Sequence, residues 1–155
     1  MKMTRLTGLA TAAALAAGAF MVMPATADAA ELVRYSIIGD GIPKSLTGKP
    51  GNVAKGRKIA YNRKQGNCLA CHKMPIPEQQ FHGEIAPGLE GVADRIGEAE
   101  MRLRIVNPKV INPDTFMPAF YRNSGFTRVL KKFKGKTILS AEQVEDLVAY
   151  MMTLK

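Results

Sequence analysis

The sequence predicts an all-α fold of short helices and long loops, with a core too thin to be completed by the polypeptide alone. Helical periodicity of apolar residues occurs in three segments, 52–64, 98–106 and 140–151. No alternation of strands and helices is evident along the chain, which argues against a parallel sheet. Three or four short helices bury little apolar surface for a domain of this length, so we expect a large apolar group to fill the core.

The first two predicted helices are each defined at one end. Asn52 can cap the helix over residues 52–64, and Gly56 inside it costs about 1 kcal/mol relative to alanine. Close packing of another helix would justify that cost. The second helix, Glu98–Val106, stops at Asn107 because a proline follows. The residues expected on the inner face of the first helix are Val53, Ile59, Ala60 and Tyr61.

The last helix has the clearest signals. Ser140 and Gln143 fit a capping box. Apolar residues follow at helical spacing, namely Val144, Leu147, Val148 and Met151. Between the helices, residues 78–91 read as a loop and residues 107–120 as an ordered, non-helical loop that contains three prolines. Residues 125–136 are basic, and the sequence pattern does not define their secondary structure.

The N-terminal segment has the pattern of a secretory signal peptide over residues 1–27. Two positive charges precede the apolar run 8–22, and an Ala-Thr-Ala cleavage site ends at Ala27; a cut after Ala29 is the alternative. A membrane anchor is the competing interpretation, but the run is shorter than the roughly 18 residues typical of a spanning helix. We therefore expect export to the periplasm as a soluble protein. Residues 28–51 should form an irregular arm that wraps a single domain, 52–155.

The chain is strongly basic, with a formal net charge of +9 over 155 residues. Removal of Lys2 and Arg5 with the signal peptide would leave 20 basic and 13 acidic residues. Such a surface can attract nucleic acid, anionic membrane or an acidic protein, and export disfavours nucleic acid. A basic run is formed by Lys131, Lys132, Lys134 and Lys136. It is either a docking face for an acidic partner or a solvated loop.

The only two cysteines lie three residues apart and are followed directly by a histidine. Cys68, Cys71 and His72 form the Cys-x-x-Cys-His pattern of covalent haem c attachment. One turn of chain lets both thiols reach the two vinyl groups on one porphyrin edge, and places the imidazole under the iron. The alternatives are a thiol redox pair, half of a zinc site that His72 and His82 would have to complete, or an idle disulfide. We interpret the motif as one covalent haem with His72 as an axial ligand.

Met117 is the expected second axial ligand of the iron. It follows His72 by 45 residues, and Pro113 and Pro118 would restrain its loop. His82 and an open position are the alternatives, and an exposed surface histidine is the simpler interpretation of His82. Met74 is too close to His72 in sequence to reach the opposite face. The methionines expected to fill the core instead are Met101, Met151 and Met152. His/Met ligation leaves no vacant position at the iron, which favours electron transfer over catalysis.

These motifs together resemble the class I cytochromes c. The matching features are the Cys-x-x-Cys-His motif, the Met117-Pro118 loop and the last helix with Tyr150. The resemblance implies that the first and last helices cross, with Gly56 as a candidate contact and Tyr150 packed at the junction. It also implies that the carbonyl of Pro87 accepts the second imidazole proton of His72 and so fixes the ring.

A closer resemblance, to the SoxX family, covers nearly all of the chain after the predicted signal peptide. It is carried by the segments 66–72, 105–108, 112–121 and 139–150, of which the loop around Met117 is the most specific. SoxX proteins are the small cytochrome subunits of the SoxAX complex of periplasmic sulfur oxidation. The resemblance implies a SoxA-type haem subunit as partner, with the SoxYZ carrier as an indirect one. In that complex thiosulfate is joined oxidatively to a cysteine of the carrier.

The implied role is therefore a relay of electrons to a soluble cytochrome. The resemblance implies that the reactive haem, which is ligated by a cysteine, lies in SoxA. This chain has no third cysteine to supply such a ligand, so it would be the non-catalytic haem subunit of an L-cysteine S-thiosulfotransferase. Three alternatives remain. They are a free cytochrome that donates electrons to a terminal oxidase, a haem enzyme or gas sensor with a vacant distal position, and a thiol oxidoreductase.

Overall fold

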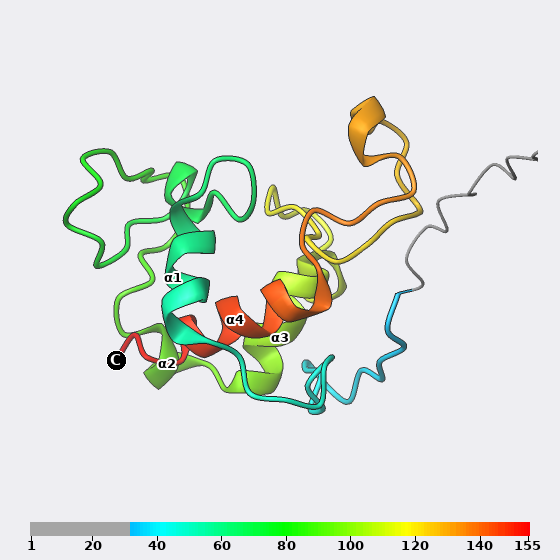
Figure 1. The fold of residues 1–155 in the computed structure, drawn as a ribbon, viewed down its shortest axis with the longest axis horizontal. Helices are drawn as coiled ribbons and strands as arrows, with labels where there is room; N and C mark the ends of the chain where they lie inside the picture. The colour runs from blue at the N-terminus through cyan, green and yellow to red at the C-terminus, as the bar shows by residue number, and fades with distance from the viewer. Residues whose placement is uncertain (1–31) are drawn as a thin grey trace, which may run out of the picture.

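A computed structural model describes residues 32–155 and contains four α-helices and three 3₁₀ turns in that range (Figure 1). The predicted signal peptide, 1–27, lies outside the described residues. The α-helices are α1 (Val53–Tyr61), α2 (Val92–Arg95), α3 (Glu98–Val106) and α4 (Ala141–Met151). The 3₁₀ turns are η1 (Cys68–Ala70), η2 (Pro108–Val110) and η3 (Lys131–Phe133). The extended pairing within the described range consists of isolated bridges, and the all-α prediction is confirmed.

Helices α1 and α4 cross in close contact, and glycine makes the approach possible (Figure 1). A methyl group on Gly56 would lie 1.8 Å from the carbonyl oxygen of Asp146 and 2.9 Å from Cβ of Tyr150. No side chain larger than hydrogen fits there. Tyr150 is buried at this junction. The crossing implied by the resemblance is therefore present, with Gly56 at its centre.

The predicted caps form at both helices of the crossing. The side chain of Asn52 accepts a hydrogen bond from the backbone N–H of Lys55 at 2.9 Å. Ser140 accepts from the N–H of Gln143 at 3.2 Å, while the Gln143 amide oxygen accepts from the N–H of Ser140 at 2.9 Å. Each cap satisfies backbone donors that the first helical turn leaves without partners.

Some details of the helix predictions are wrong. Val53 was expected on the inner face of α1 but is 43% exposed, because the crossing buries Gly56, Ile59 and Ala60 instead. The prolines after α3 allow one 3₁₀ turn, η2, in the loop expected to be non-helical. The one-turn helix α2 was not predicted, because its N-cap is Gly91, which offers no side-chain cap.

The arm lies against α3 and α4 rather than forming a unit of its own (Figure 1). Ile42 and Leu46 are buried in the core. The N–H of Ile42 donates to the carbonyl of Ala99 in α3 at 2.9 Å. Near its start, the N–H of Val33 donates to the hydroxyl of Tyr121 at 3.1 Å. The arm thus connects the helices to the segment that follows Met117.

A buried ion pair fastens the arm to both helices. Arg102 of α3 is 1% exposed and Glu145 of α4 is 4% exposed, and they bond at 2.8 Å. Arg102 also donates to the carbonyl of Ile42 at 2.8 Å, and Glu145 accepts from the N–H of Leu46 at 2.9 Å. Burial alone would lower the pKa of Arg102, but its hydrogen bonds to Glu145 and Glu98 outweigh this and raise the pKa.

Within residues 32–155, every helix is too short or too polar to cross a membrane.

Candidate haem site

The cysteine motif forms a single tight turn immediately after α1. Asn67 enters the turn with a positive φ of 48°. The N–H groups of Cys71 and His72 both donate to the carbonyl of Cys68, at 3.1 and 2.9 Å. These bonds close one turn of helix, η1, so the two sulfurs and the imidazole all project from a segment of five residues. This is the local geometry that attachment to one porphyrin edge requires.

The loop that follows returns alongside the motif and is held there by its backbone. Three N–H groups of residues 83–89 donate to three carbonyls of residues 69–73. The bonds run from Gly83 to Leu69 (2.7 Å), from Ala86 to Cys71 (3.1 Å) and from Leu89 to Lys73 (2.8 Å). A methyl group on Gly83 would lie 2.2 Å from the carbonyl oxygen of Ala70, so only glycine permits this approach.

The returning loop places the carbonyl of Pro87 beside the imidazole of His72. The carbonyl oxygen of Pro87 lies 2.7 Å from Nδ1 of His72, the hydrogen bond that the resemblance implied. Because a carbonyl can only accept, Nδ1 carries the proton and the lone pair of the neutral ring is at Nε2. The bond therefore orients the ring and leaves Nε2 able to bind a metal ion.

The two cysteines are free thiols in the described chain, not a disulfide. Burial raises the pKa of Cys68 to about 12, so this sulfur is neutral at physiological pH. A thioether is also neutral, so a covalent link at Cys68 would introduce no charge into this apolar position. A reactive thiol redox site requires the opposite, a lowered thiol pKa.

Met117 lies on a separate loop that is fixed at both sides. Before it, Lys109 donates to the carbonyl of Thr115 at 2.5 Å, and the hydroxyl of Thr115 accepts from the N–H of Met117 at 3.2 Å. After it, the N–H of Phe120 donates to the carbonyl of Ile105 in α3 at 3.1 Å. Met117 is half-buried against the same hydrophobic core as Cys68. Among the hydrogen bonds of residues 32–155, none joins Met117 to the cysteine motif.

His82 is not the exposed surface residue that the sequence suggested. It is half-buried, and its Nδ1 accepts from the N–H of Met74 at 3.2 Å. Its Nε2 lies 3.0 Å from the carbonyl of Gln79 and 3.3 Å from that of Ile76. Both ring nitrogens therefore bond to the backbone of the loop 74–82. His82 fixes this loop, and neither nitrogen is available as the ligand that the alternatives required.

The other methionines pack in the core. Met101 and Met151 are 5% and 3% exposed, and Met74 is 4% exposed. Met152 packs against the same core from its edge. The expectation that these methionines fill the core is confirmed for Met101 and Met151, whereas Met152 is only partly buried.

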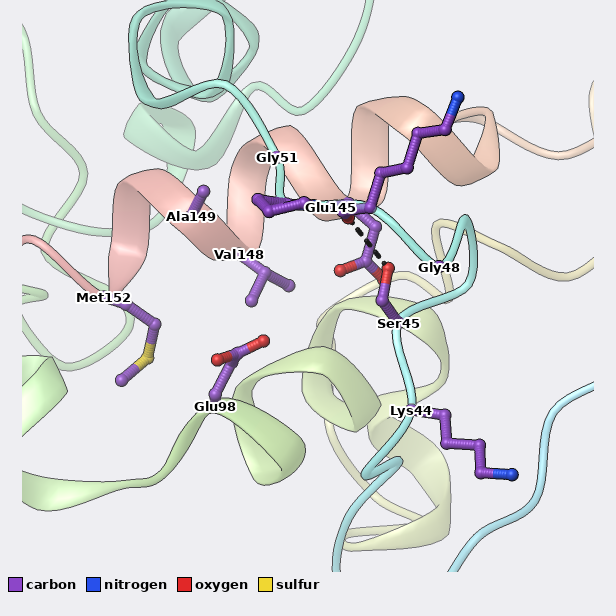
Figure 2. Close-up of a pocket in the computed structure, with 11 residues that line it drawn as sticks. Lys44, Ser45, Gly48, Gly51, Glu98, Glu145, Val148, Ala149 and Met152 are labelled. Atoms are coloured by element: carbon purple, nitrogen blue, oxygen red, sulfur yellow. Dashed lines mark hydrogen bonds between the residues drawn. The ribbon is translucent and has the colours of Figure 1, made fainter.

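A cavity of about 610 Å³ lies elsewhere, between the arm, α3 and α4 (Figure 2). Glu98 faces Val148 and Met152 across it, and Ser45 and Gly48 of the arm close one side (Figure 2). Its lining contains neither cysteine of the motif, nor His72, nor Met117. The cavity is therefore a gap beneath the arm and separate from the candidate haem site.

Comparison with known proteins defines the class. The cytochrome c family model matches residues 53–155, so the chain belongs to the cytochrome c family. The chain is similar to a chain of the crystal structure of SoxXA from P. pantotrophus, with 42% sequence identity and a TM-score of 0.73. The match covers 78% of this chain and 94% of that chain. It confirms the resemblance to the SoxX family. No curated protein sequence matches the chain.

As a cytochrome c, the protein carries haem c and transfers electrons. The residues present fit this group. They provide two free thiols on one turn and an imidazole whose Nε2 lone pair is free. When bound, haem supplies an iron that alternates between the ferrous and ferric states. The polypeptide attaches, orients and encloses it.

Proposed function

We propose that this protein is a periplasmic mono-haem cytochrome that relays electrons as the SoxX-type subunit of a SoxAX complex. The observation that carries the proposal is the 42% identity to a SoxXA chain over 94% of that chain's length. In this proposal residues 1–27 direct export, residues 28–51 form the arm, and residues 52–155 form the haem domain. The partner is a SoxA-type haem subunit.

The haem is attached at Cys68 and Cys71, and its iron is held by Nε2 of His72 and the sulfur of Met117. The Pro87 carbonyl supports the first ligand, since it fixes the protonated Nδ1 at 2.7 Å. Backbone bonds on both sides of Met117 support the second ligand, since they restrain the loop that presents the sulfur. With both axial positions filled by side chains, the site suits outer-sphere electron transfer.

In the complex, this chain receives electrons when thiosulfate is coupled to a cysteine of the SoxYZ carrier, and it passes them to a soluble cytochrome. Both of its own cysteines are committed to haem, so the chain has no thiol to take part in the coupling. The alternative function, a free cytochrome that donates to a terminal oxidase, would use the same haem site without a fixed partner.

Replacement of Met117 by leucine tests the ligand assignment. We expect the far-red sulfur–iron absorbance of the oxidised protein to disappear and carbon monoxide to bind rapidly to the reduced protein. Met101→Leu is the matched control, because that buried methionine lies in α3 and should leave the spectrum unchanged. An unchanged spectrum for Met117→Leu would refute the assignment.

Native purification separates the relay from the free shuttle. We expect a second haem protein to co-purify with this chain, and deletion of its gene to stop thiosulfate oxidation. A monomeric protein whose deletion leaves thiosulfate oxidation intact would favour the free shuttle.

A further inference from the structure

A dense basic segment without acidic residues lies between the Met117 loop and α4. Residues 122–136 contain six basic side chains and no acidic one, and we call this segment the basic lobe. The nearest acidic residues in sequence are Asp114 and Glu142. The basic residues are Arg122, Arg128, Lys131, Lys132, Lys134 and Lys136. The lobe therefore carries a formal +6 of the chain's net +9.

The basic lobe projects from the helices as an extended loop, drawn in yellow to orange in Figure 1. Its four lysines and Arg128 are exposed. None of its six basic side chains forms an ion pair with a carboxylate of residues 32–155. Because the charges are neither paired nor buried, they create an outward positive field that a partner in solution can sense.

The base of the lobe is closed directly beside the proposed iron ligand. The N–H groups of Ile138 and Leu139 both donate to the carbonyl of Phe120 at 3.0 Å. Phe120 is buried and follows Met117 by three residues. The fully exposed Phe116, at 98%, precedes Met117 by one. A partner that docks on the lobe is therefore held close to the loop that carries Met117.

The aromatic residues of the lobe favour a protein over a membrane as the occupant. Insertion into a lipid surface uses free aromatic and leucine side chains. Here the guanidinium of Arg122 lies 5.0 Å from the ring centre of Phe126, and the ammonium of Lys132 lies 4.8 Å from that of Phe133. These cation–π contacts engage both rings within the lobe, although Phe126 remains 40% exposed, and leave Leu130, at 66% exposed, as its most exposed large apolar side chain.

We propose that the basic lobe, residues 122–136, is the docking surface for an acidic redox protein, and that electrons cross on the Met117 side of the haem. This inference rests on the proposed iron ligation. It adds which face of this protein binds the partner and which charge the partner carries. Electrostatic steering raises the association rates of charged protein pairs by on the order of 10- to 1,000-fold. This gain in rate falls steeply as the ionic strength rises.

The test is the rate at which the reduced haem protein is oxidised by a purified acidic mono-haem cytochrome in a stopped-flow experiment. The lobe variant is K131Q/K132Q/K134Q/K136Q. The control is K44Q/K49Q/K55Q/K58Q, which removes the same charge from exposed lysines of the arm and α1. At about 10 mM ionic strength we expect the oxidation rate to fall about tenfold in the lobe variant and about twofold in the control. At about 1 M ionic strength the oxidation rates of the wild-type protein and the two variants should converge.

Equal losses in the two variants would overturn the proposal, because net charge rather than the lobe would then set the rate. Sedimentation with vesicles containing phosphatidylglycerol tests the competing occupant. If only the lobe variant lost vesicle binding and its oxidation rate did not change, the partner of the lobe would be a membrane and not an acidic protein. Failure of the proposed ligation is read separately, because the absorption spectrum of each variant reports the covalent haem and its sulfur ligand.

Discussion

The helix crossing and the ligand loops are built in different ways. At the crossing, α1 and α4 meet through Gly56 with backbone in contact, and the side chains around it are buried. The loops on either side of the proposed haem expose large apolar side chains, including Phe81 at 82%, Ile85 at 80% and Phe116 at 98%. The crossing is thus completed by polypeptide contacts, whereas the loops leave apolar surface available to the haem or to a partner.

This difference separates what fixes the fold from what fixes the site. The crossing depends on shape, since each contact removes apolar surface from water at close-packed density. The loops depend on individual hydrogen bonds, such as those of His82 with the backbone and of Pro87 with His72. Changes at the crossing should therefore alter global stability, and changes in the loops should act locally.

The largest expected effect is at the ion pair that joins the arm to the helices. Glu145→Ala would leave the Arg102 guanidinium buried without its main partner, and we expect a loss of about 3–5 kcal/mol in the free energy of unfolding. Urea denaturation followed by circular dichroism measures it. Arg104→Ala is the control, because the Arg104–Glu100 pair is partly exposed and should contribute about 0–1 kcal/mol. Similar losses for both variants would contradict the importance of burial.

The next effect is at the crossing itself. Gly56→Ala places a methyl group 1.8 Å from the carbonyl oxygen of Asp146, so the helices must separate. We expect a loss of about 1–3 kcal/mol, measured by thermal and urea denaturation. Gly97→Ala is the matched control, because the added methyl group meets nothing within 4 Å. A stable Gly56→Ala variant would mean that the crossing is looser than described.

The smallest effect is in the loop held by His82. Removal of the imidazole in His82→Ala frees the N–H of Met74 and the carbonyl of Gln79, and we expect a loss of about 1 kcal/mol. Hydrogen exchange should increase in residues 74–82 before it does in α1 or α4. The absorption spectrum should not change. A spectral change like that of Met117→Leu would mean that His82 reaches the iron after all.

Sequence patterns predicted the parts of the fold that are encoded locally. Asn52 and the Ser140–Gln143 pair act through residues three positions away, so the caps of α1 and α4 could be read directly. The role of Gly56 required the resemblance, since a glycine in a helix does not identify its neighbour. The position of Pro87 likewise came from the family pattern.

What the sequence did not predict depends on contacts between distant segments. The Arg102–Glu145 bond joins residues 43 positions apart. A signal existed, because both charges fall on the apolar faces of their helices, but it does not identify the partner. His82 was assigned to the surface because the sequence does not show its hydrogen bonds. These bonds form only when the loop folds back on Ile76 and Gln79.

The most direct test of this account is the mass of the purified mature protein, produced together with the haem-attachment machinery and measured after acid denaturation. The account predicts one haem that remains bound to the denatured chain, and its loss in the variant Cys68→Ser/Cys71→Ser. A colourless wild-type protein with the mass of the bare polypeptide would contradict it.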